Sequence, residues 1–229
     1  MSSIKDRFES VQERIDLAAR RSGRSPEDIR IMAVSKLHPR EKVQEAYEAG
    51  VRLFGENRVQ EAEEKYADFH EDAELHLIGH LQSNKAKQVV GLVKCVQSID
   101  KLKTANEIEK RCSAAQEHMD IYLEFNTSGE ASKSGYLSKD DMFADIEKMA
   151  ELEHLSIRGL MTIGPLTEDE QRVREAFVQL RQLFDETAGK YPHLPLNVLS
   201  MGMTSDCEIA VEEGSTMVRI GSALFGPRE

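Results

Sequence analysis

Several features that mark particular classes of protein are scarce or missing in this sequence. Among its 229 residues there is no tryptophan, and the three cysteines, Cys95, Cys112 and Cys207, form no Cys-x-x-Cys pair. An odd number of widely separated cysteines provides no disulfide framework. The histidines form no His-Glu-x-x-His motif, so no metal-binding spacing is evident. The composition therefore predicts a protein of a reducing compartment, the cytoplasm, without a metal site.

An excess of positive charge and long apolar runs are also absent. The chain has 30 Lys and Arg residues against 41 Asp and Glu residues, which gives a net charge of -11. The phosphate backbone of a nucleic acid would be repelled, because no local basic patch is evident. No apolar run approaches the length of a membrane span, and the charged N-terminus lacks the apolar core of a signal peptide. We therefore expect no nucleic-acid partner and no membrane partner.

What the chain does contain is a regular alternation of strand and helix signals. Apolar residues at helical spacing predict a leading helix over 4–21, within a leading segment 1–24. Strands are predicted at 29–36, 51–54, 75–78, 95–99, 121–125, 157–163, 196–200 and 217–221, with helical segments between them. Eight such units predict a single α/β domain over 1–229, a (β/α)8 TIM-type barrel with an extra N-terminal helix. A doubly wound open sheet is the alternative, disfavoured because no Gly-x-Gly-x-x-Gly motif occurs.

The first predicted strand ends in a lysine. Lys36 closes the apolar run that begins at Ile29, and Pro39 prevents further regular pairing. A lysine in this place can extend its ammonium group into water. A desolvated lysine instead has a lowered pKa and attacks carbonyl carbons. The strand alone does not decide between these two roles.

Small and hydroxyl-bearing residues follow the seventh and eighth predicted strands. In barrels of this kind these two loops often bind phosphate, which makes Ser200 and the pair Gly221 and Ser222 candidates for an anion pocket. Small residues can equally serve tight turns. Arg219 shares a strand face with Gly221 and should point into the barrel, where it needs an anion, an inward carboxylate or another strong acceptor. A lysine, an anion pocket and an inward arginine together indicate pyridoxal 5'-phosphate (PLP) as cofactor.

The same residues carry a resemblance to a known family. The segments AVSKLHP, LFGENRVQE, HLIGHLQSNKAK, NTSGEASKSG, RGLMTIGP and LSMGMTSDCEIAVEEGSTMVRIGSALFG resemble the successive motifs of the pyridoxal phosphate homeostasis proteins. The resemblance extends over 31–226. It implies a fold-type III PLP-binding barrel, similar to the N-terminal domain of alanine racemase, without a well-established catalytic turnover.

The resemblance also implies roles for individual residues. Lys36 would be the Schiff-base lysine, and Arg219 would be the partner of the pyridine nitrogen. Asn57 would be a polar contact near the ring. His80 and Met201 are possible further contacts without a defined role, and the 129–135 loop is either a lid or a turn rich in small residues. The phosphate contacts would be Ser200, Gly221 and Ser222. Two small departures from the family pattern, Arg58 and Thr204, lie beside these positions.

Catalysis on amino acids needs more than a bound cofactor. A racemase needs a second acid or base, which alanine racemases take from an appended domain of a partner subunit, whereas this sequence ends at Glu229 soon after the eighth predicted strand. An arginine partner also leaves the pyridine nitrogen unprotonated, which weakens the electron sink. We therefore expect a monomeric carrier or buffer of PLP that affects amino-acid pools, with PLP-dependent apo-enzymes as further partners. A weak PLP-dependent racemase or lyase and a class I Schiff-base aldolase are the alternatives.

Overall fold

The computed structural model describes residues 2–130 and 133–226. Its parallel strands follow one another in chain order around a closed barrel, and β8 pairs with β1. The strands are β1 (Arg30–Val34), β2 (Leu53–Glu56), β3 (Glu74–Leu77), β4 (Cys95–Ile99), β5 (Met119–Glu124), β6 (Leu155–Met161), β7 (Val198–Met203) and β8 (Met217–Ile220). The predicted eight-stranded α/β barrel is therefore confirmed.

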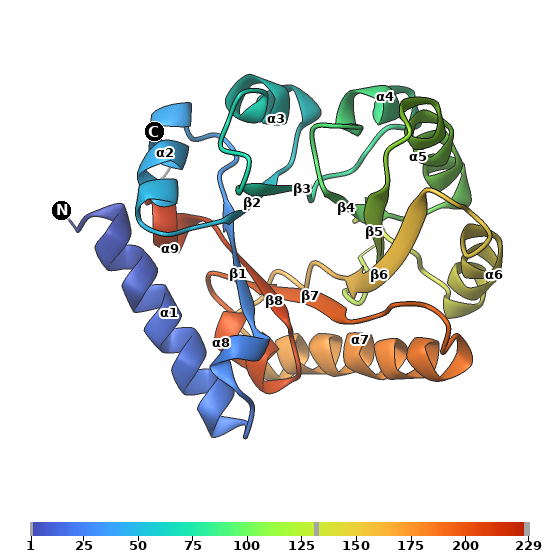
Figure 1. Cartoon of the computed structure of the whole chain (residues 1–229). Coiled ribbons are helices and arrows are strands. Elements are labelled where there is room, and N and C mark those ends of the chain that lie inside the picture. The colour runs from blue at the N-terminus through green and yellow to red at the C-terminus, as the bar shows by residue number, and fades with distance from the viewer. Residues whose placement is uncertain (1, 131–132, 227–229) are drawn as a thin grey trace.

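Helices surround the ring of strands (Figure 1). Before and between the strands lie α1 (Ile4–Arg21), η1 (Pro26–Asp28), α2 (Arg40–Glu48), α3 (Val59–Tyr66), η2 (Ser83–Lys85), α4 (Ala86–Val89), α5 (Leu102–Ala115), α6 (Lys139–Met149), α7 (Glu170–Lys190) and α8 (Cys207–Glu212), and α9 (Ser222–Phe225) follows β8. Among the described residues, no helix combines the length and the apolar character needed to cross a membrane.

Two apolar layers hold the barrel together. The larger one lies between the strands and the helices, where alternate strand residues meet the apolar faces of the helices. The smaller one fills the barrel interior and consists mainly of Met32, Val34, Leu53, Ile78, Cys95, Tyr122, Met161 and Met217. The barrel is thus packed along its axis, and polar groups inside it must find partners within the protein.

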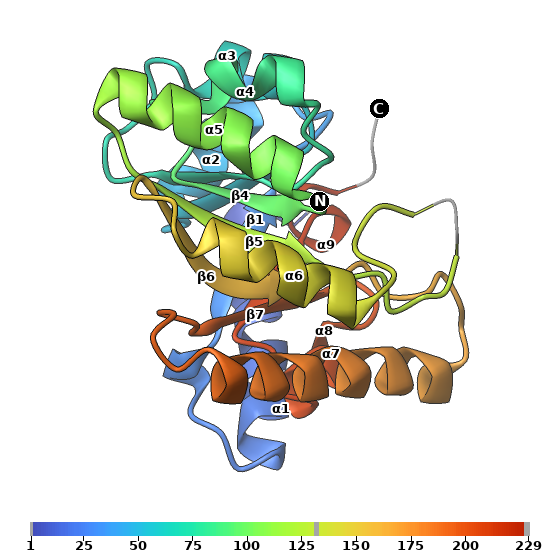
Figure 2. The ribbon, with the colours of Figure 1, turned by 90° about the vertical axis from the view of Figure 1, so that its right-hand side faces the viewer.

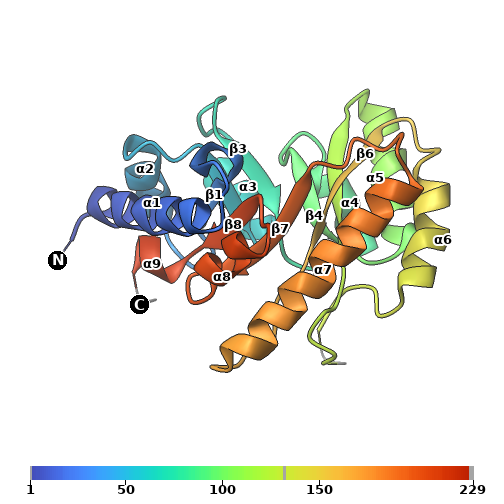
Figure 3. The same ribbon diagram turned by 90° about the horizontal axis from the view of Figure 1, so that it is seen from below.

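The leading helix α1 has a capped start and is bonded from its middle to the α8 region of the barrel. A capping box joins Ser3 and Asp6 at its start. Figure 3 shows α1 beside α8 and α9. There Arg14 binds Glu208 through two hydrogen bonds of 2.7 and 2.9 Å, and its Nη2 donates to the Thr204 carbonyl at 3.2 Å. The extra helix therefore supports the loop between β7 and α8.

The strand boundaries differ from the predictions at three places that bear on function. β1 ends at Val34, so Lys36 lies in the turn after the strand. β2 extends to Glu56, whose side chain is fully buried. β7 begins at Val198 and extends to Met203, which places Ser200 inside the strand instead of at its end. Parallel pairing with neighbouring strands sets these limits, and a single stretch of sequence does not contain that information.

Candidate functional site

The carboxyl ends of the strands form one end of the barrel, here called the mouth. In Figure 2 the strands run toward the right of the view, where α9 and the loop after β5 lie. A cavity of about 300 Å³ opens at the mouth. Of the residues predicted from the sequence, it is lined by Lys36, Asn57, Arg219, Gly221 and Ser222. Five predicted residues that come from three separate loops and a strand therefore meet in one place.

The cavity wall also contains residues that the sequence analysis did not assign to the site. Met203, Thr204 and Ser205 line it from the loop after β7, and Val34, Ile78 and Ile163 supply apolar surface. Because β7 ends at Met203, three residues later than predicted, the cavity residues of this loop are 203–205 and not Ser200. An aspartate is typical of the residue before a helix, so Asp206 could have indicated in the sequence that the loop ends there. In the structure it accepts a hydrogen bond from the Met203 N–H at 2.5 Å.

Lys36 is held in a turn with an unusual backbone. Leu37, the next residue, has a φ of 64°, a left-handed conformation that costs free energy for a residue other than glycine. Its N–H donates to Glu61 Oε2 at 2.8 Å, and its side chain is 55% exposed. Packing of the Leu37 side chain therefore does not explain the conformation. The hydrogen bond to α3 does, and it fixes the direction in which the chain leaves Lys36.

A charged cluster lies behind this turn. We call Ser35, Glu56, Glu61, Lys65 and Tyr66 the Glu56 cluster. Lys65 Nζ donates to the Ser35 carbonyl at 3.0 Å, to Glu56 Oε1 at 2.9 Å and to Glu61 Oε2 at 3.1 Å. The Ser35 hydroxyl donates to Glu56 Oε1 at 2.7 Å and also contacts the Tyr66 hydroxyl. Glu56 Oε2 is buried without a hydrogen-bond partner, and burial raises the pKa of Glu56.

Arg219 points into the barrel, as the alternation of β8 predicted. Its side chain is buried, with Nη1 donating to the Ser200 hydroxyl at 2.7 Å and Nη2 to the Thr162 carbonyl at 2.6 Å. Burial lowers the pKa of Arg219 to about 10, opposed by the charges of Asp206 and Glu124. The guanidinium therefore stays charged at neutral pH and acts only as a donor.

Ser200 and Met201 do not lie in the cavity wall. The Ser200 side chain is fully buried, and its hydroxyl accepts from Arg219 and donates to Gln97 Oε1 at 2.7 Å. Met201 is fully buried in the apolar layer outside the strands. A hydroxyl that is committed to two protein groups has little capacity left for a ligand. The position of Ser200 therefore favours a role in supporting Arg219 over the predicted phosphate contact.

Asn57 and His80 lie around a second cavity beside the first. This cavity, of about 350 Å³, is lined by both residues together with Arg58 and Lys85. A Cβ atom on Gly79 would lie only 2.2 Å from the Asn57 carbonyl oxygen. Only glycine therefore allows the backbone at residue 79 to pack this closely against the backbone of Asn57. His80 does not line the first cavity, and its Nδ1 lies 3.7 Å from Asp100 Oδ2.

The loop after β5 is folded around one amide side chain in its described part. Asn126 Oδ1 accepts hydrogen bonds from the N–H groups of Ser128 and Gly129 and from the Ser128 hydroxyl, and Asn126 Nδ2 donates to the Glu130 and Lys133 carbonyls. Residues 131 and 132 of the predicted 129–135 loop lie outside the described residues. The described bonds give the loop a local structure and leave both predicted roles, lid or turn, as hypotheses.

The donor set of the first cavity fits PLP. Lys36 provides an amine for the aldehyde, Arg219 a charged donor, and Ser222 and Thr204 hydroxyls for a phosphate. A Cβ atom on Gly221 would meet nothing closer than the Val34 carbonyl oxygen at 3.5 Å. Packing within the protein thus leaves room for a side chain at this cavity-lining position. The space that glycine leaves is available to a ligand.

Comparisons with known proteins define the class of protein first. Residues 8–229 match the family model described as "Alanine racemase, N-terminal domain". An alanine racemase from Clostridium difficile superposes with a TM-score of 0.76 at 14% identity, and the match covers 97% of this chain and 55% of that chain. At this identity the likeness concerns the fold alone.

Closer relatives define the particular family. The pyridoxal phosphate homeostasis protein of Aquifex aeolicus is 40% identical over 225 residues, covering 98% of each chain. The Escherichia coli K12 protein of the same name is 40% identical over 234 residues, covering 100% of this chain and 98% of that protein. The structure of PipY from Synechococcus elongatus PCC7942 with PLP bound has a TM-score of 0.85 at 34% identity, covering 97% of this chain and 100% of that chain. The chain belongs to the pyridoxal phosphate homeostasis protein family.

Proposed function

We propose that this chain binds PLP in the cavity at the mouth and takes part in intracellular PLP and vitamin B6 homeostasis by holding and releasing the cofactor. The observation that carries the proposal is the meeting of Lys36 and Arg219 in one cavity with hydroxyl-bearing residues. Relatives named for PLP homeostasis, and the PLP-bound PipY structure, support the choice of ligand. The whole chain acts as a single domain in this role.

The polar residues of the cavity wall and Gly221 each receive a part in this proposal. Lys36 forms the covalent link to the cofactor, and Arg219 donates to the pyridine nitrogen. Ser222 and the backbone at Gly221 bind the phosphate. Thr204 and Ser205 bind it from the loop after β7, in place of the predicted contact Ser200. The remaining residue, Asn57, is a polar contact near the ring.

We also propose that turnover is inefficient. Bound PLP supplies an electrophilic aldehyde and a ring that accepts electrons best when its nitrogen is protonated. Arg219 stays positively charged at neutral pH, so it keeps that nitrogen unprotonated. The described cavity wall contains one titratable side chain besides Arg219, namely Lys36, so a second acid or base is not supplied there.

The test uses the visible spectrum of the purified full-length protein. We expect a yellow protein whose visible band disappears on borohydride reduction, with the reduced group found on Lys36 by peptide mapping. Lys36→Ala should remove the reducible band but keep part of the affinity, because the phosphate contacts persist. Lys85→Ala is the matched control, since Lys85 lines the neighbouring cavity, and it should leave the band unchanged. A colourless wild-type protein would favour the aldolase alternative and contradict the proposal.

Three further parts of the proposal concern the protein in the cell. It acts as a monomer in the cytoplasm, and PLP-dependent apo-enzymes receive the cofactor from it. Analytical ultracentrifugation tests the first point, and transfer of PLP from the loaded protein to an apo-enzyme tests the last. Incubation with single L-amino acids, followed by measurement of chirality and product, distinguishes a carrier from a weak racemase or lyase.

A further inference from the structure

A chain of hydrogen bonds crosses the barrel interior from the cavity to the opposite end. Arg219 Nη1 donates to the Ser200 hydroxyl at 2.7 Å, and that hydroxyl donates to Gln97 Oε1 at 2.7 Å. Gln97 Nε2 lies 2.7 Å from His76 Nδ1, and His76 Nε2 lies 2.6 Å from Glu74 Oε1. We call these five residues the Arg219 relay. They come from β8, β7, β4 and β3 and cross the centre of the barrel.

The relay has one direction. A guanidinium can only donate hydrogen bonds and a carboxylate can only accept them, so both ends are fixed. Gln97 Nε2 also contacts Met217 Sδ, a weak acceptor, at 3.2 Å, which agrees with an amide nitrogen at this position. His76 Nδ1 must then accept from Gln97, and the proton of the neutral imidazole lies on Nε2. Every donor in the chain therefore points away from the cavity.

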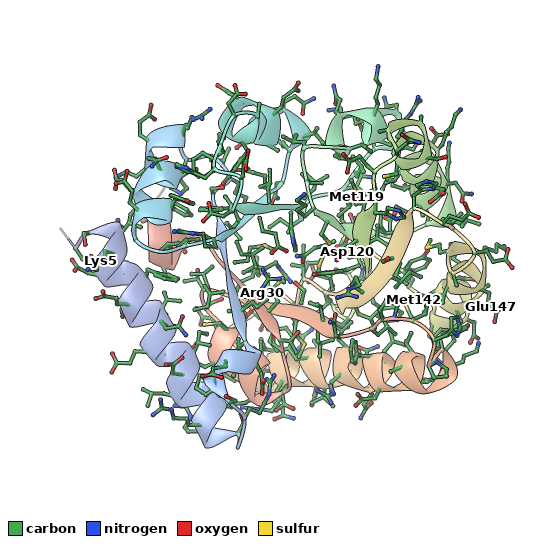
Figure 4. The ribbon with its side chains drawn as sticks, in the orientation of Figure 1. Lys5, Arg30, Met119, Asp120, Met142 and Glu147 are labelled. Carbon is green, nitrogen blue, oxygen red and sulfur yellow. The ribbon has the colours of Figure 1, made fainter. Side chains whose placement is uncertain are left out.

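The interior members of the relay act at a distance from the ligand. His76, Gln97 and Ser200 are each at most 1% exposed, and none of them lines the cavity. The Glu74 end is open to solvent, where Glu74 Oε2 accepts from Arg30 Nη2 at 2.5 Å. Figure 4 shows Arg30, together with Asp120, at this amino-terminal end of the barrel. The three interior residues can therefore reach a ligand only through Arg219.

We propose that His76, Gln97 and Ser200 are positioning residues that hold the Arg219 guanidinium in one orientation at the cavity, and that a second proton on His76 releases it. The inference rests on the proposed function only for the identity of the ligand that Arg219 meets. Its own content is the state of the relay, which can be observed in the protein without PLP.

A proton on His76 Nδ1 propagates along the relay by simple donor and acceptor rules. A protonated Nδ1 is a donor, so Gln97 must turn its amide to present Oε1. Gln97 Nε2 then faces Ser200, whose hydroxyl must accept from two donors and loses the acceptor for its own proton. One proton near the amino-terminal end therefore changes the hydrogen bonding of the residue that holds Arg219.

The surroundings of His76 determine when this change occurs. The charged and titratable groups that face it are Glu74 from its own strand, Arg30 from β1, Cys95 from β4, and Asp120 and Tyr122 from β5. Burial lowers the pKa of His76, and the Glu74 hydrogen bond opposes this effect. The neutral form is thus favoured at neutral pH, and we expect the change on the acid side of the ordinary histidine range.

The first experiment observes the relay directly in the full-length protein without PLP. Long-range ¹H–¹⁵N correlation spectra of ¹⁵N-histidine-labelled protein should show His76 at pH 7 as the neutral tautomer with its proton on Nε2. A charged His76, or a proton on Nδ1 alone, would overturn the proposal. Failure of the wild-type protein to bind PLP would contradict the proposed function and leave this readout intact, so the two failures are distinguishable.

The second experiment breaks and restores the acceptor for Ser200. Gln97→Met removes it, and PLP binding should weaken roughly tenfold with a shifted visible band, because the Ser200 hydroxyl that binds Arg219 loses its own acceptor and is no longer fixed. Gln97→Glu keeps an oxygen toward Ser200 and should retain affinity within about threefold, while adding a proton to His76. Wild-type affinity should fall more steeply with acidification than the affinity of Gln97→Met, because imine formation and the phosphate of PLP depend on pH in both proteins and only the wild type adds the change at His76.

Leu53→Ala is the matched control for these two variants. Leu53 lies in the same interior layer without a hydrogen bond to the relay, so this change should lower stability while the tautomer, the band and the pH profile stay unchanged. Equal affinity and spectra in Gln97→Met and Leu53→Ala would show that the relay is merely structural, and would refute the proposal. If Gln97→Met does not fold, Gln97→Glu decides the case by the charge state of His76 and by an acid dependence shallower than that of the wild type.

Discussion

The Glu56 cluster and the Arg219 relay support the two main groups of the cavity in different ways. Behind Lys36, a buried ammonium and a buried carboxylate neutralise each other, and one carboxylate oxygen is left without a partner. Behind Arg219, neutral groups connect the guanidinium to a carboxylate near the surface, and each link is 2.7 Å or shorter. Removal of either charge from the Glu56 cluster leaves the other charge buried without a partner. Removal of a neutral group from the Arg219 relay instead leaves the remaining groups without a fixed orientation.

Local charge balance explains why the two arrangements differ. Lys65 is nine residues from Glu56 and four from Glu61, so the short segment from β2 to α3 supplies all the charged groups of the cluster, and only Ser35 comes from further away, 21 residues from Glu56. The Arg219 guanidinium lies where phosphate and ring atoms must also fit under our proposal, and a carboxylate bound directly to it would neutralise its charge. A relay of neutral groups orients the guanidinium and leaves its charge available for a ligand.

The largest expected difference between the two regions is in stability. Lys65→Met leaves Glu56 buried without its cation, and we expect a loss of about 3–5 kcal/mol in the free energy of unfolding at pH 7. Gln97→Met removes only neutral hydrogen bonds and should cost about 1–3 kcal/mol. Urea denaturation measures both values. The double variant Glu56→Gln with Lys65→Met should recover much of the loss, and a double variant as unstable as Lys65→Met would contradict this account.

The eight-stranded barrel and the inward direction of Arg219 could be predicted, the first from the alternation of strand and helix signals and the second from the two-residue period of a strand. The roles of His76 and Gln97 could not, although a glutamine within the otherwise apolar segment CVQSI was a visible anomaly. Their partners are 21 and 103 residues apart in the chain and meet only when the barrel closes. Ser200 was misplaced for a related reason, since pairing with β6 and β8 extends β7 beyond it.

A smaller difference is expected in the pH dependence of stability. Burial raises the pKa of Glu56, so its favourable contribution is present below the unfolded value of about 4.5 and is lost as pH rises through and above that value. Hydrogen bonds from His76 and Arg30 overcome partial burial and lower the pKa of Glu74 to about 2. The Glu74 contribution is therefore present above about 4.5 and is lost as pH falls toward about 2.

Two variants separate these opposite signs. The free energy of unfolding of Glu56→Gln, relative to that of the wild type, should rise as pH rises above about 4.5. The same difference for Glu74→Gln should fall as pH rises from about 2 to 4.5. Because the Glu74 side chain is 34% exposed, we expect only about 1–2 kcal/mol from it after screening by solvent. Urea denaturation series between pH 2 and 8 provide the measurement. Parallel curves for the two variants would show that the clusters do not differ in this way.

The smallest effect concerns the backbone that joins the Glu56 cluster to Lys36. Leu37 and Gln116 are the described non-glycine residues with positive φ, at 64° and 55°. Glycine relieves the left-handed conformation but adds freedom to the unfolded chain, so both Leu37→Gly and Gln116→Gly should change the free energy of unfolding by about 1 kcal/mol or less. Only Leu37→Gly loosens the turn that carries Lys36, and PLP affinity should fall about two- to fivefold in this variant alone. Spectroscopic PLP titrations measure the affinities, and an equal fall in Gln116→Gly, at the end of α5, would exclude a local effect of the turn.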